Sequence, residues 1–465
     1  MNLTLSQIAG LLGVGRDAPH AEPAAGFSID SRTIQPGEVF FAIKAARDGH
    51  EFVAAALAKG AAAAVVDRTW DAPPAARRAV LFRVDDPAAA LAELAQRVRR
   101  RWGRPLVAIT GSNGKTTTKE ITAALLGARY RVAKTVGNLN NELGLPLSIL
   151  NAPDDAEVAV MELGMNRPGE IRRLARIAQP TIGVVTNVSG AHVGNFESVD
   201  EVASAKRELI EELGASATAV LNADDSRVKK FGVEHRGPTL LFGVSSRADL
   251  RLDAIQATSQ GWRFKLSSKG RGRKSAEFET RLVGRHNLLN IAAAAAAARS
   301  FGIELEELRE PIAALAPAAM RGELRHLNGV TVLDDSYNSN PAAAEAMLDA
   351  LQTLPADRRI AVLGEMRELG KQSERLHRAL GRRAAAAKLD LLVGVAGAAA
   401  ALVKAARAAG MPAEAALYFE TPEEAGAALQ GRLRAGDAVL FKGSRAVGVD
   451  RALQGALRQT NAASG

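Results

Sequence analysis

The sequence predicts an α/β protein of three domains, with parallel sheets in its middle and last parts. At roughly 150 residues per domain, its 465 residues would fill about three domains. Short apolar runs of strand length alternate with longer amphipathic stretches along most of the chain, which is typical of parallel sheets covered by helices. From the order of these elements we place the domains at residues 1–101, 102–320 and 321–465.

The composition is that of a globular protein and excludes several kinds of chemistry. Hydrophobic residues make up 47% and charged residues 24% of the chain, which are ordinary values. The absence of cysteine excludes disulfides, thiolate metal ligands and cysteine nucleophiles, and it fits a reducing cytoplasm. The segment Met1–Arg16 predicts a short amphipathic helix and not a signal peptide. Since no run of about 18 strongly apolar residues occurs, we expect no membrane span.

The positive net charge does not predict a nucleic-acid partner. The chain has 60 basic and 51 acidic residues, a net charge of +9, but the basic residues are mostly scattered and aromatic residues make up only 4%. One basic cluster lies at the first domain junction, and we interpret it as solvated linker charge. It consists of Arg97, Arg99, Arg100, Arg101 and Arg104. A modest positive field also suits small anionic substrates such as nucleotides.

The first domain reads as a small α/β unit. Its apolar runs predict strands over Glu38–Ile43, Ala62–Val66 and Ala79–Phe82. Stretches rich in alanine predict helices over Val53–Lys59 and Pro87–Arg100.

The middle domain should hold a central parallel sheet. Continuous apolar runs predict buried strands over Leu106–Thr110, Val158–Leu163 and Ile182–Val188, with helices between them. From Thr239 to Leu282 the runs become shorter and alternating, and we expect an antiparallel excursion there. A helix near Asn287–Phe301 should close the domain.

The third domain is expected to be a doubly wound, Rossmann-like sheet, because strand and helix patterns alternate again. The predicted strands are Val330–Asp334, Ile360–Leu363, Leu389–Val395, Ala415–Phe419 and Ala438–Phe441.

A phosphate-binding loop follows the first strand of the middle domain. A strand, a glycine turn and a helix start occur in the order that such a loop requires, and the predicted ATP-binding residues are Gly111, Ser112, Asn113, Gly114, Lys115, Thr116 and Thr117. Lys115 would reach the β- and γ-phosphates, and the Thr116 hydroxyl would coordinate Mg²⁺. The loop is a shortened variant, because two residues separate Gly111 from Gly114 where the general pattern has four before its Gly-Lys pair. A fortuitous glycine turn is the weaker alternative.

Polar residues follow two further strands at the edge where this loop lies. Glu162 is a hard oxygen ligand that suits Mg²⁺, and His192 could bind a metal or phosphate. Position alone leaves an ion-paired carboxylate and a hydrogen-bonded loop histidine equally open. Lys206 lies on a predicted amphipathic helix, where the pattern alone indicates a solvated surface lysine.

Together these features resemble the Mur ligases, the ATP-dependent enzymes that assemble the peptide stem of bacterial peptidoglycan. The motifs that carry the resemblance span nearly the whole chain in the expected order. They are Thr110–Thr117, Gly137–Pro146, Glu162–Ile171, Thr186–His192, Lys206, Gly284–Asn290, Asp334–Pro341, Leu363–Gly370 and Lys442–Arg445. Several of them match the branch of the family that adds D-alanyl-D-alanine to UDP-N-acetylmuramoyl-tripeptide.

The resemblance implies roles for particular residues. Lys115, Glu162, His192 and Lys206 would be catalytic, with Thr116, Glu162, His192 and a carbamate of Lys206 serving two Mg²⁺ ions. Nucleotide contacts would also come from Asn287, Asn290, Arg321 and Asp335. Substrate contacts would come from Ser31, Arg32, Asn138, Asn141, Tyr337, Asn338 and Asn340.

The resemblance also implies the reaction and its setting. A central phosphate-loop ATPase domain would activate a carboxylate as an acyl phosphate, and the third domain would bring the incoming dipeptide. We expect a cytoplasmic monomer that binds neither nucleic acid nor membrane. The alternatives are a sister Mur ligase, a folylpolyglutamate-synthase-like ligase, or a non-catalytic nucleotide-binding switch.

Overall fold

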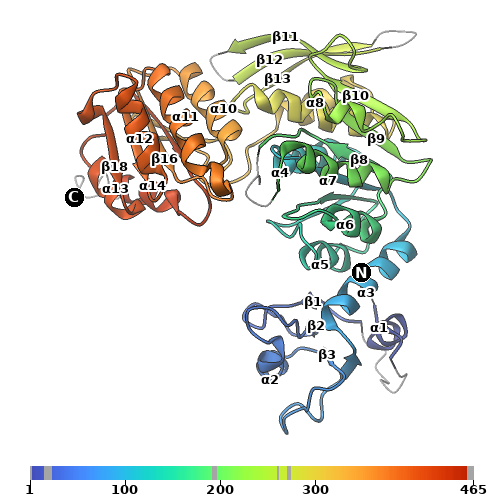
Figure 1. Cartoon of the computed structure of the whole chain (residues 1–465). Helices are drawn as coiled ribbons and strands as arrows, with labels where there is room; N and C mark the ends of the chain where they lie inside the picture. The colour runs from blue at the N-terminus through green and yellow to red at the C-terminus, as the bar shows by residue number, and fades with distance from the viewer. Residues whose placement is uncertain (1–2, 15–22, 191–195, 259–260, 270–273, 458–465) are drawn as a thin grey trace.

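The computed structural model describes residues 3–14, 23–190, 196–258, 261–269 and 274–457. These residues form three sheets, each with its own helices (Figure 1). The first is at the bottom of the view, the second at upper right and the third at upper left. The predicted α/β class, with parallel sheets in the middle and last parts, is confirmed. The proposed domain boundaries remain predictions.

The first sheet is parallel throughout, in the order β1-β2-β3-β4. Its strands are β1 (Gly26–Ser28), β2 (Glu38–Phe41), β3 (Ala63–Asp67) and β4 (Leu81–Val84). Its helices are α1 (Leu5–Leu12), the 3₁₀ helix η1 (Gly49–Phe52), α2 (Val53–Ala58) and α3 (Pro87–Trp102). The short β1 was not predicted, because three residues carry too little periodicity.

Helix α3 connects the first sheet to the second (Figure 1). It begins at the cap Asp86, with Pro87 in its first turn, and ends at Gly103 in the left-handed conformation. The prediction that its basic end is solvated is wrong for Arg99, which is only 4% exposed. Arg99 Nε donates to Ala178 O at 2.7 Å and its NH2 donates to Gln179 O at 3.1 Å, so it caps the end of helix α6 (Glu170–Ala178).

The second sheet runs in the order β13-β12-β11-β10-β9-β8-β5-β7-β6. Its strands are β5 (Leu106–Thr110), β6 (Val132–Lys134), β7 (Val158–Glu162), β8 (Ile182–Val185), β9 (Thr218–Asn222), β10 (Thr239–Gly243), β11 (Leu250–Thr258), β12 (Gly261–Ser268) and β13 (Ser275–Thr280). The associated helices are α4 (Lys115–Leu126), α5 (Gly144–Leu150), α6, α7 (Val199–Glu211), α8 (His286–Arg299), η3 (Val228–Lys230), η4 (Glu306–Leu308) and α9 (Arg309–Ala313).

The expected antiparallel excursion begins later than predicted. Strand β10 pairs in parallel with both β9 and β11, and the antiparallel ladder is limited to β11, β12 and β13. Alternating burial belongs to the antiparallel strands, as in β13, whereas β10 is half-buried at its start and buried at its carboxyl end.

Each face of the second sheet packs into a separate core. One face packs with residues of α5, α6 and α7, and this cluster continues into the first sheet and α3. The other face packs against α4 and α8. Ala292–Ala298 of α8 are all buried, since their small side chains allow the helix to lie close to its neighbours. No helix in the described ranges is long and apolar enough to cross a membrane.

The third sheet has the order β14-β15-β19-β16-β17-β18, with β14 as an antiparallel edge. Its strands are β14 (Glu323–Leu327), β15 (Val330–Asp334), β16 (Arg358–Gly364), β17 (Leu391–Val395), β18 (Ala416–Phe419) and β19 (Asp437–Lys442). Its helices are α10 (Pro341–Thr353), η5 (Gly370–Gln372), α11 (Ser373–Ala386), α12 (Ala399–Ala408), η6 (Ala413–Ala415), α13 (Pro422–Leu429) and α14 (Val449–Leu457).

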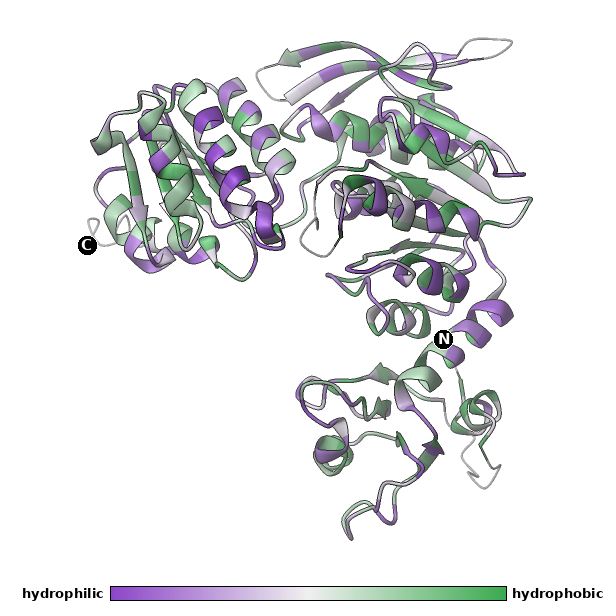
Figure 2. Cartoon of the chain, in the orientation of Figure 1, coloured by the Kyte–Doolittle hydropathy of each residue, from purple (hydrophilic) through white to green (hydrophobic). Residues whose placement is uncertain are grey.

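The helices cover both faces of this sheet, as the doubly wound pattern predicts. Residues of α10, α11 and α12 form one core with it, and residues of α13 and α14 form the other. Figure 2 shows hydrophobic strands inside the domain and hydrophilic residues along the outer sides of its helices.

The buried Arg99 generates a prediction about stability. Replacement by methionine keeps most of the aliphatic stem but removes two hydrogen bonds to carbonyls at the end of α6. We expect Arg99→Met to lower the free energy of unfolding by about 2–4 kcal/mol, because both carbonyls lose a charged donor. Urea unfolding measures the change. The exposed neighbour Arg101→Met is the matched control and should cost less than about 0.5 kcal/mol; equal losses would contradict the assigned role.

Candidate functional site

A cleft of about 610 Å³ lies between the second and third sheets and collects most of the predicted site residues. Its walls come from the phosphate loop, from the segments after β6 and β7, from the start of α8, and from the segment between β15 and α10. Both the phosphate loop and the β15–α10 segment follow the carboxyl ends of parallel strands. Ligands bind in this position in open α/β sheets.

The phosphate loop joins β5 to α4, and two of its glycines allow close contacts behind it. Gly111 has φ +150°, and a Cβ there would lie 1.9 Å from Thr186 Oγ1. Gly114 has φ +80°, and its Cβ would lie 2.3 Å from Asn290 Oδ1. Gly114 occupies the N-cap of α4 without a side-chain cap, so the first turn of the helix presents its backbone N–H groups to the cleft.

Lys115 folds back on the loop that carries it. Its Nζ donates to Gly111 O at 2.7 Å and to Ser112 O at 3.3 Å. Burial lowers the pKa of Lys115, the Glu162 carboxylate opposes this, and the charge of Arg321 adds to it. The hydrogen bonds to carbonyls hold the ammonium next to the place where phosphates would enter.

Glu162 lies beside Thr116 at the end of β7. Thr116 Oγ1 donates to Glu162 Oε2 at 2.7 Å, and Asn140 Nδ2 donates to Oε1 at the same distance. Glu162 is 2% exposed, and its backbone N–H donates to Thr135 Oγ1 at 3.0 Å. A carboxylate and a hydroxyl in contact are hard oxygen donors that fit a magnesium ion. No cluster of three or more acidic, histidine or cysteine side chains with metal-binding geometry occurs among the described residues.

Lys206 is buried, so its interpretation from the pattern as a surface lysine is wrong. It is 1% exposed within α7. Burial holds its pKa well below the ordinary value of 10.5, and the nearby charge of Lys115 lowers it further. The sequence pattern failed because Lys206 occupies the inward stripe of an amphipathic helix. The predicted His192 lies outside the described residues.

Asn287 and Asn290 support the loop from α8. Asn290 Oδ1 accepts from Thr118 Oγ1 at 3.3 Å, and its Nδ2 donates to Asn287 Oδ1 at 2.9 Å. Asn287 Nδ2 in turn donates to Val283 O at 2.7 Å. Thr117, Asn287 and Arg321 also line an adjoining cavity of about 610 Å³ next to α4 and α9.

The third domain contributes a polar segment to the cleft. Lys442, which is 2% exposed, forms an ion pair with Asp335 and donates to Asn338 O at 3.0 Å. The Arg321 guanidinium lies 4.1 Å from the centroid of the Tyr337 ring. Burial lowers the pKa of His286, at the start of α8, and the charge of Asp335 opposes this shift.

Two of the predicted substrate-contact residues, Ser31 and Arg32, lie apart from this cleft, in the first domain. Arg32 forms a bidentate hydrogen-bonded pair with Asp30, with contacts of 2.6 and 2.9 Å, and its side chain is 86% exposed. The guanidinium lowers the pKa of Asp30 to about 2. Ser31 is adjacent, and its carbonyl accepts from Lys59 Nζ at 2.9 Å.

The predicted Asn138 and Asn141 both line the cleft. Asn141 Oδ1 also accepts from Gly144 N at 2.8 Å, at the start of α5. Asn140, between them, contacts Glu162 and was missed. Three asparagines in four residues gave no signal to distinguish them. Lys442 and Asn187 were also missed as individual residues, although both lie in motifs that we had noted.

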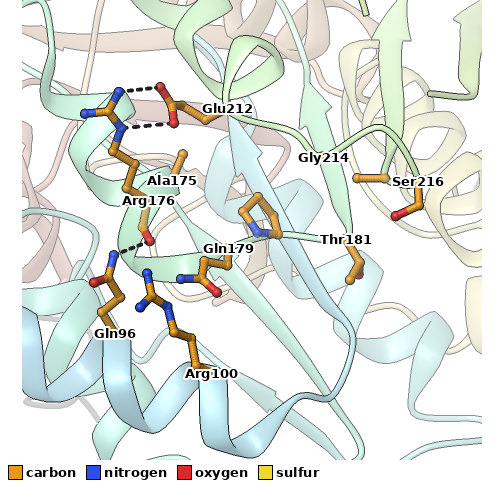
Figure 3. Close-up of a pocket in the computed structure, with 11 residues that line it drawn as sticks. Gln96, Arg100, Ala175, Arg176, Gln179, Thr181, Glu212, Gly214 and Ser216 are labelled. Carbon is orange, nitrogen blue, oxygen red and sulfur yellow. Dashed lines mark hydrogen bonds and ion pairs between the residues drawn. The ribbon is translucent and has the colours of Figure 1, made fainter. Parts of the chain in front are cut away.

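A separate cavity of about 540 Å³ lies at the amino ends of the parallel strands of the second sheet, opposite the cleft (Figure 3). Thr181 and Ala217, which precede β8 and β9, line it. Arg176 is neutralised there by two contacts of 3.0 Å with Glu212. The cavity contains none of the predicted site residues.

The fold and the site together define a phosphate-loop ATPase domain coupled to a second α/β domain. Family models match in the same order: the Mur ligase family catalytic domain over residues 24–99, the Mur ligase middle domain over 109–298 and the Mur ligase glutamate ligase domain over 320–445. The chain belongs to the Mur ligase family.

Similar proteins narrow the assignment within the family. UDP-N-acetylmuramoyl-tripeptide–D-alanyl-D-alanine ligase of Bacillus subtilis is 34% identical over 368 residues, covering 78% of each chain. The crystal structure of MurF from Acinetobacter baumannii has a TM-score of 0.88 at 28% identity and covers 99% of both chains. MurF ligase from Thermotoga maritima, in complex with ADP, has a TM-score of 0.82 at 32% identity, covering 94% of this chain and 98% of that one.

The lowered pKa of Lys206 generates a prediction about pH. Above its folded-state pKa the buried amine is neutral, while in the unfolded chain it stays protonated up to its ordinary value of 10.5. The unfolded chain therefore binds more protons over this interval, and the free energy of unfolding rises with pH. We expect Lys206→Met to be more stable than the wild type at the lower end of the interval, and this advantage to shrink towards pH 10.5.

Denaturant unfolding at several pH values, in buffer freed of CO₂, measures this difference. Replacing the exposed Lys404 by methionine is the control and should give a difference that does not vary with pH. A flat difference for Lys206→Met would contradict a buried neutral amine.

Proposed function

We propose that this chain is the ATP-dependent ligase that joins D-alanyl-D-alanine to UDP-N-acetylmuramoyl-tripeptide in peptidoglycan precursor synthesis. The observation that carries the proposal is the placement of Lys115, Thr116 and Glu162 opposite the segment from Asp335 to Asn340 in one cleft. The named relatives and the ADP-bound neighbour support the same activity.

The chemistry explains why a phosphate loop is needed. A carboxylate does not react with an amine at neutral pH, so it must first be activated. Transfer of the ATP γ-phosphoryl group to the terminal carboxylate of the tripeptide gives an acyl phosphate and ADP. The free amino group of the dipeptide then attacks the acyl carbon, and phosphate leaves as the amide forms. The chain needs no nucleophile of its own, which agrees with the absence of cysteine.

The residues of the cleft supply position and charge for these steps. The backbone N–H groups at the start of α4 and the Lys115 ammonium bind the transferred phosphate. The cationic wall of the cleft stabilises the oxyanion that forms when the amine attacks. Closure of the third domain excludes water, which would otherwise hydrolyse the acyl phosphate.

The donor set fits magnesium. Thr116 and Glu162 would hold one ion, and His192 with a carbamate of Lys206 would serve a second. Bound magnesium would neutralise negative charge on the phosphates. A buried lysine with a depressed pKa is chemically suited to carbamate formation, because only the neutral amine adds to CO₂. The product is an anion, which would relieve the repulsion between two neighbouring lysines.

The remaining predicted residues are assigned by where they lie. Asn287, Asn290 and Arg321 would serve the adenosine side, where the adjoining cavity meets the cleft. Ser31 and Arg32 would contact the uridine of the first substrate, and Asn138 its peptide. Tyr337 and Asn338 face the cleft from the third domain and would contact the dipeptide. We propose that the protein acts as a monomer in the cytoplasm.

Coupled assays test the function directly. With both substrates and ATP, the wild type should form one amide bond per phosphate released, and release should require D-alanyl-D-alanine. Lys115→Ala should lower turnover by about 1,000-fold, because the cation that meets the γ-phosphate is gone. The exposed Lys404→Ala is the control. Phosphate release that follows glutamate, and not the dipeptide, would support a folylpolyglutamate-synthase-like ligase. No release would support a nucleotide-binding switch.

The carbamate of Lys206 has its own test. Lys206→Ala should lose activity, and added formate or acetate should restore part of it, because a small carboxylate can occupy the space of the missing carbamate. The matched variant is Lys206→Met, which fills that space and should not respond to the added acid. Full activity of the alanine variant without added carboxylate would reject the assignment.

A further inference from the structure

A hydrogen bond joins the third domain directly to the phosphate loop. Asn340 Nδ2 donates to Asn113 Oδ1 at 2.5 Å, across 227 positions of the sequence. We propose that Asn340 is a positioning residue that holds Asn113 when the third domain closes, so that amide formation, and not nucleotide binding, depends on it. This inference rests on the proposed function and replaces the expectation that Asn340 contacts the dipeptide.

The orientation of the Asn340 amide is fixed by a second hydrogen bond. Asn340 is the N-cap of α10, and its Oδ1 accepts from Ala343 N at 3.0 Å. A backbone N–H can only donate, so the oxygen must face the helix. The amide nitrogen must therefore face Asn113, whichever way the side chain would otherwise turn.

Asn113 is already held on its other sides by the segment that follows β8. Its backbone N–H donates to Asn187 Oδ1 at 3.0 Å, and its carbonyl accepts from Thr186 Oγ1 at 2.6 Å. Its Nδ2 donates to Ser189 Oγ at 3.1 Å. With these contacts made, Oδ1 is the acceptor that Asn113 presents to the third domain.

The segment that presents Asn340 is braced within its own domain. Lys442 pairs with Asp335 and binds the carbonyl of Asn338. Tyr337 N donates to Met320 O at 3.2 Å, next to the point where the chain enters the third domain. Asn340 should therefore move together with the third domain as one rigid body.

The position of Asn113 explains why the contact affects catalysis. Asn113 immediately precedes Gly114 and Lys115, so a shift of its side chain moves the backbone that cradles the phosphates. Small displacements of such groups reduce rates strongly. Nucleotide can bind the loop before the third domain closes, through the backbone of α4, and its affinity should therefore be nearly independent of Asn340.

Two substitutions of Asn340 separate the contact from the cap. Asn340→Asp keeps the oxygen that caps α10 but replaces the donor by a carboxylate that repels Asn113 Oδ1. Asn340→Ala removes both. We expect each to lower kcat for amide formation about 10- to 100-fold, with the KM values for ATP and for D-alanyl-D-alanine changed less than about twofold. A KM increase for the dipeptide with kcat unchanged would overturn the proposal in favour of direct substrate contact.

A double-mutant cycle tests the partnership. Asn113→Ala should lose a similar factor, and Asn113→Ala combined with Asn340→Ala should be no slower than the slower single variant, because both remove the same bond. Losses that multiply would overturn the proposal. The wild type is assayed first for amide formation, so a failure of the proposed function is recognised separately from a failure of this contact.

The matched control is a cap elsewhere in the third domain. Thr421 caps α13 through Glu424 N at 3.2 Å, at the start of a helix outside the cleft. Thr421→Ala should lower the melting temperature about as much as Asn340→Ala does, yet leave kcat within twofold. If Thr421→Ala lost as much kcat, general destabilisation would account for the effect and the proposal would fail.

Discussion

The site depends on the close approach of the phosphate loop to the elements behind it. Gly111 touches Thr186 and Gly114 touches Asn290 at distances that leave no room for a side chain. These contacts fix the loop against β8 on one side and α8 on the other. Because these contacts restrict the loop backbone from behind, its N–H groups stay directed at the cleft. Glu162, Lys206 and the third-domain segment are then arranged around a fixed anion site.

The charges of the cleft follow from that anion site. Three lysines lie in or near this site: Lys115, Lys206 and Lys442. The last two are almost fully buried. Lys442 has a carboxylate partner in Asp335, whereas burial and the charge of Lys115 lower the pKa of Lys206. Buried cations are costly without a counter-charge. Nucleotide phosphates and a carbamate would supply that charge. The lysines that lower the stability of the unliganded protein would therefore favour the nucleotide-bound state.

The sequence predicted the fold class and the phosphate loop, because strand, glycine turn and helix start are local patterns. It also placed Glu162 at the correct edge, since parallel strands share their carboxyl ends. It could not show that Lys206 and Arg99 are buried, because an amphipathic pattern does not reveal which charged residue lies on the inward stripe. Nor could it distinguish Asn140 from its neighbours: that choice depends on the fold of the loop around Glu162.

The helix α3, through which the first sheet meets the second, carries Trp102 at its end, with the Arg99 guanidinium 5.4 Å from the indole ring. The chain has three tryptophans, and the others are Trp70 beside β3 and Trp262 on β12. The third domain contains none. Tryptophan fluorescence, excited selectively, therefore reports on the first two domains alone, and Trp102 is a native optical probe of their junction. A tryptophan engineered into the third domain would supply a separate signal for its movement.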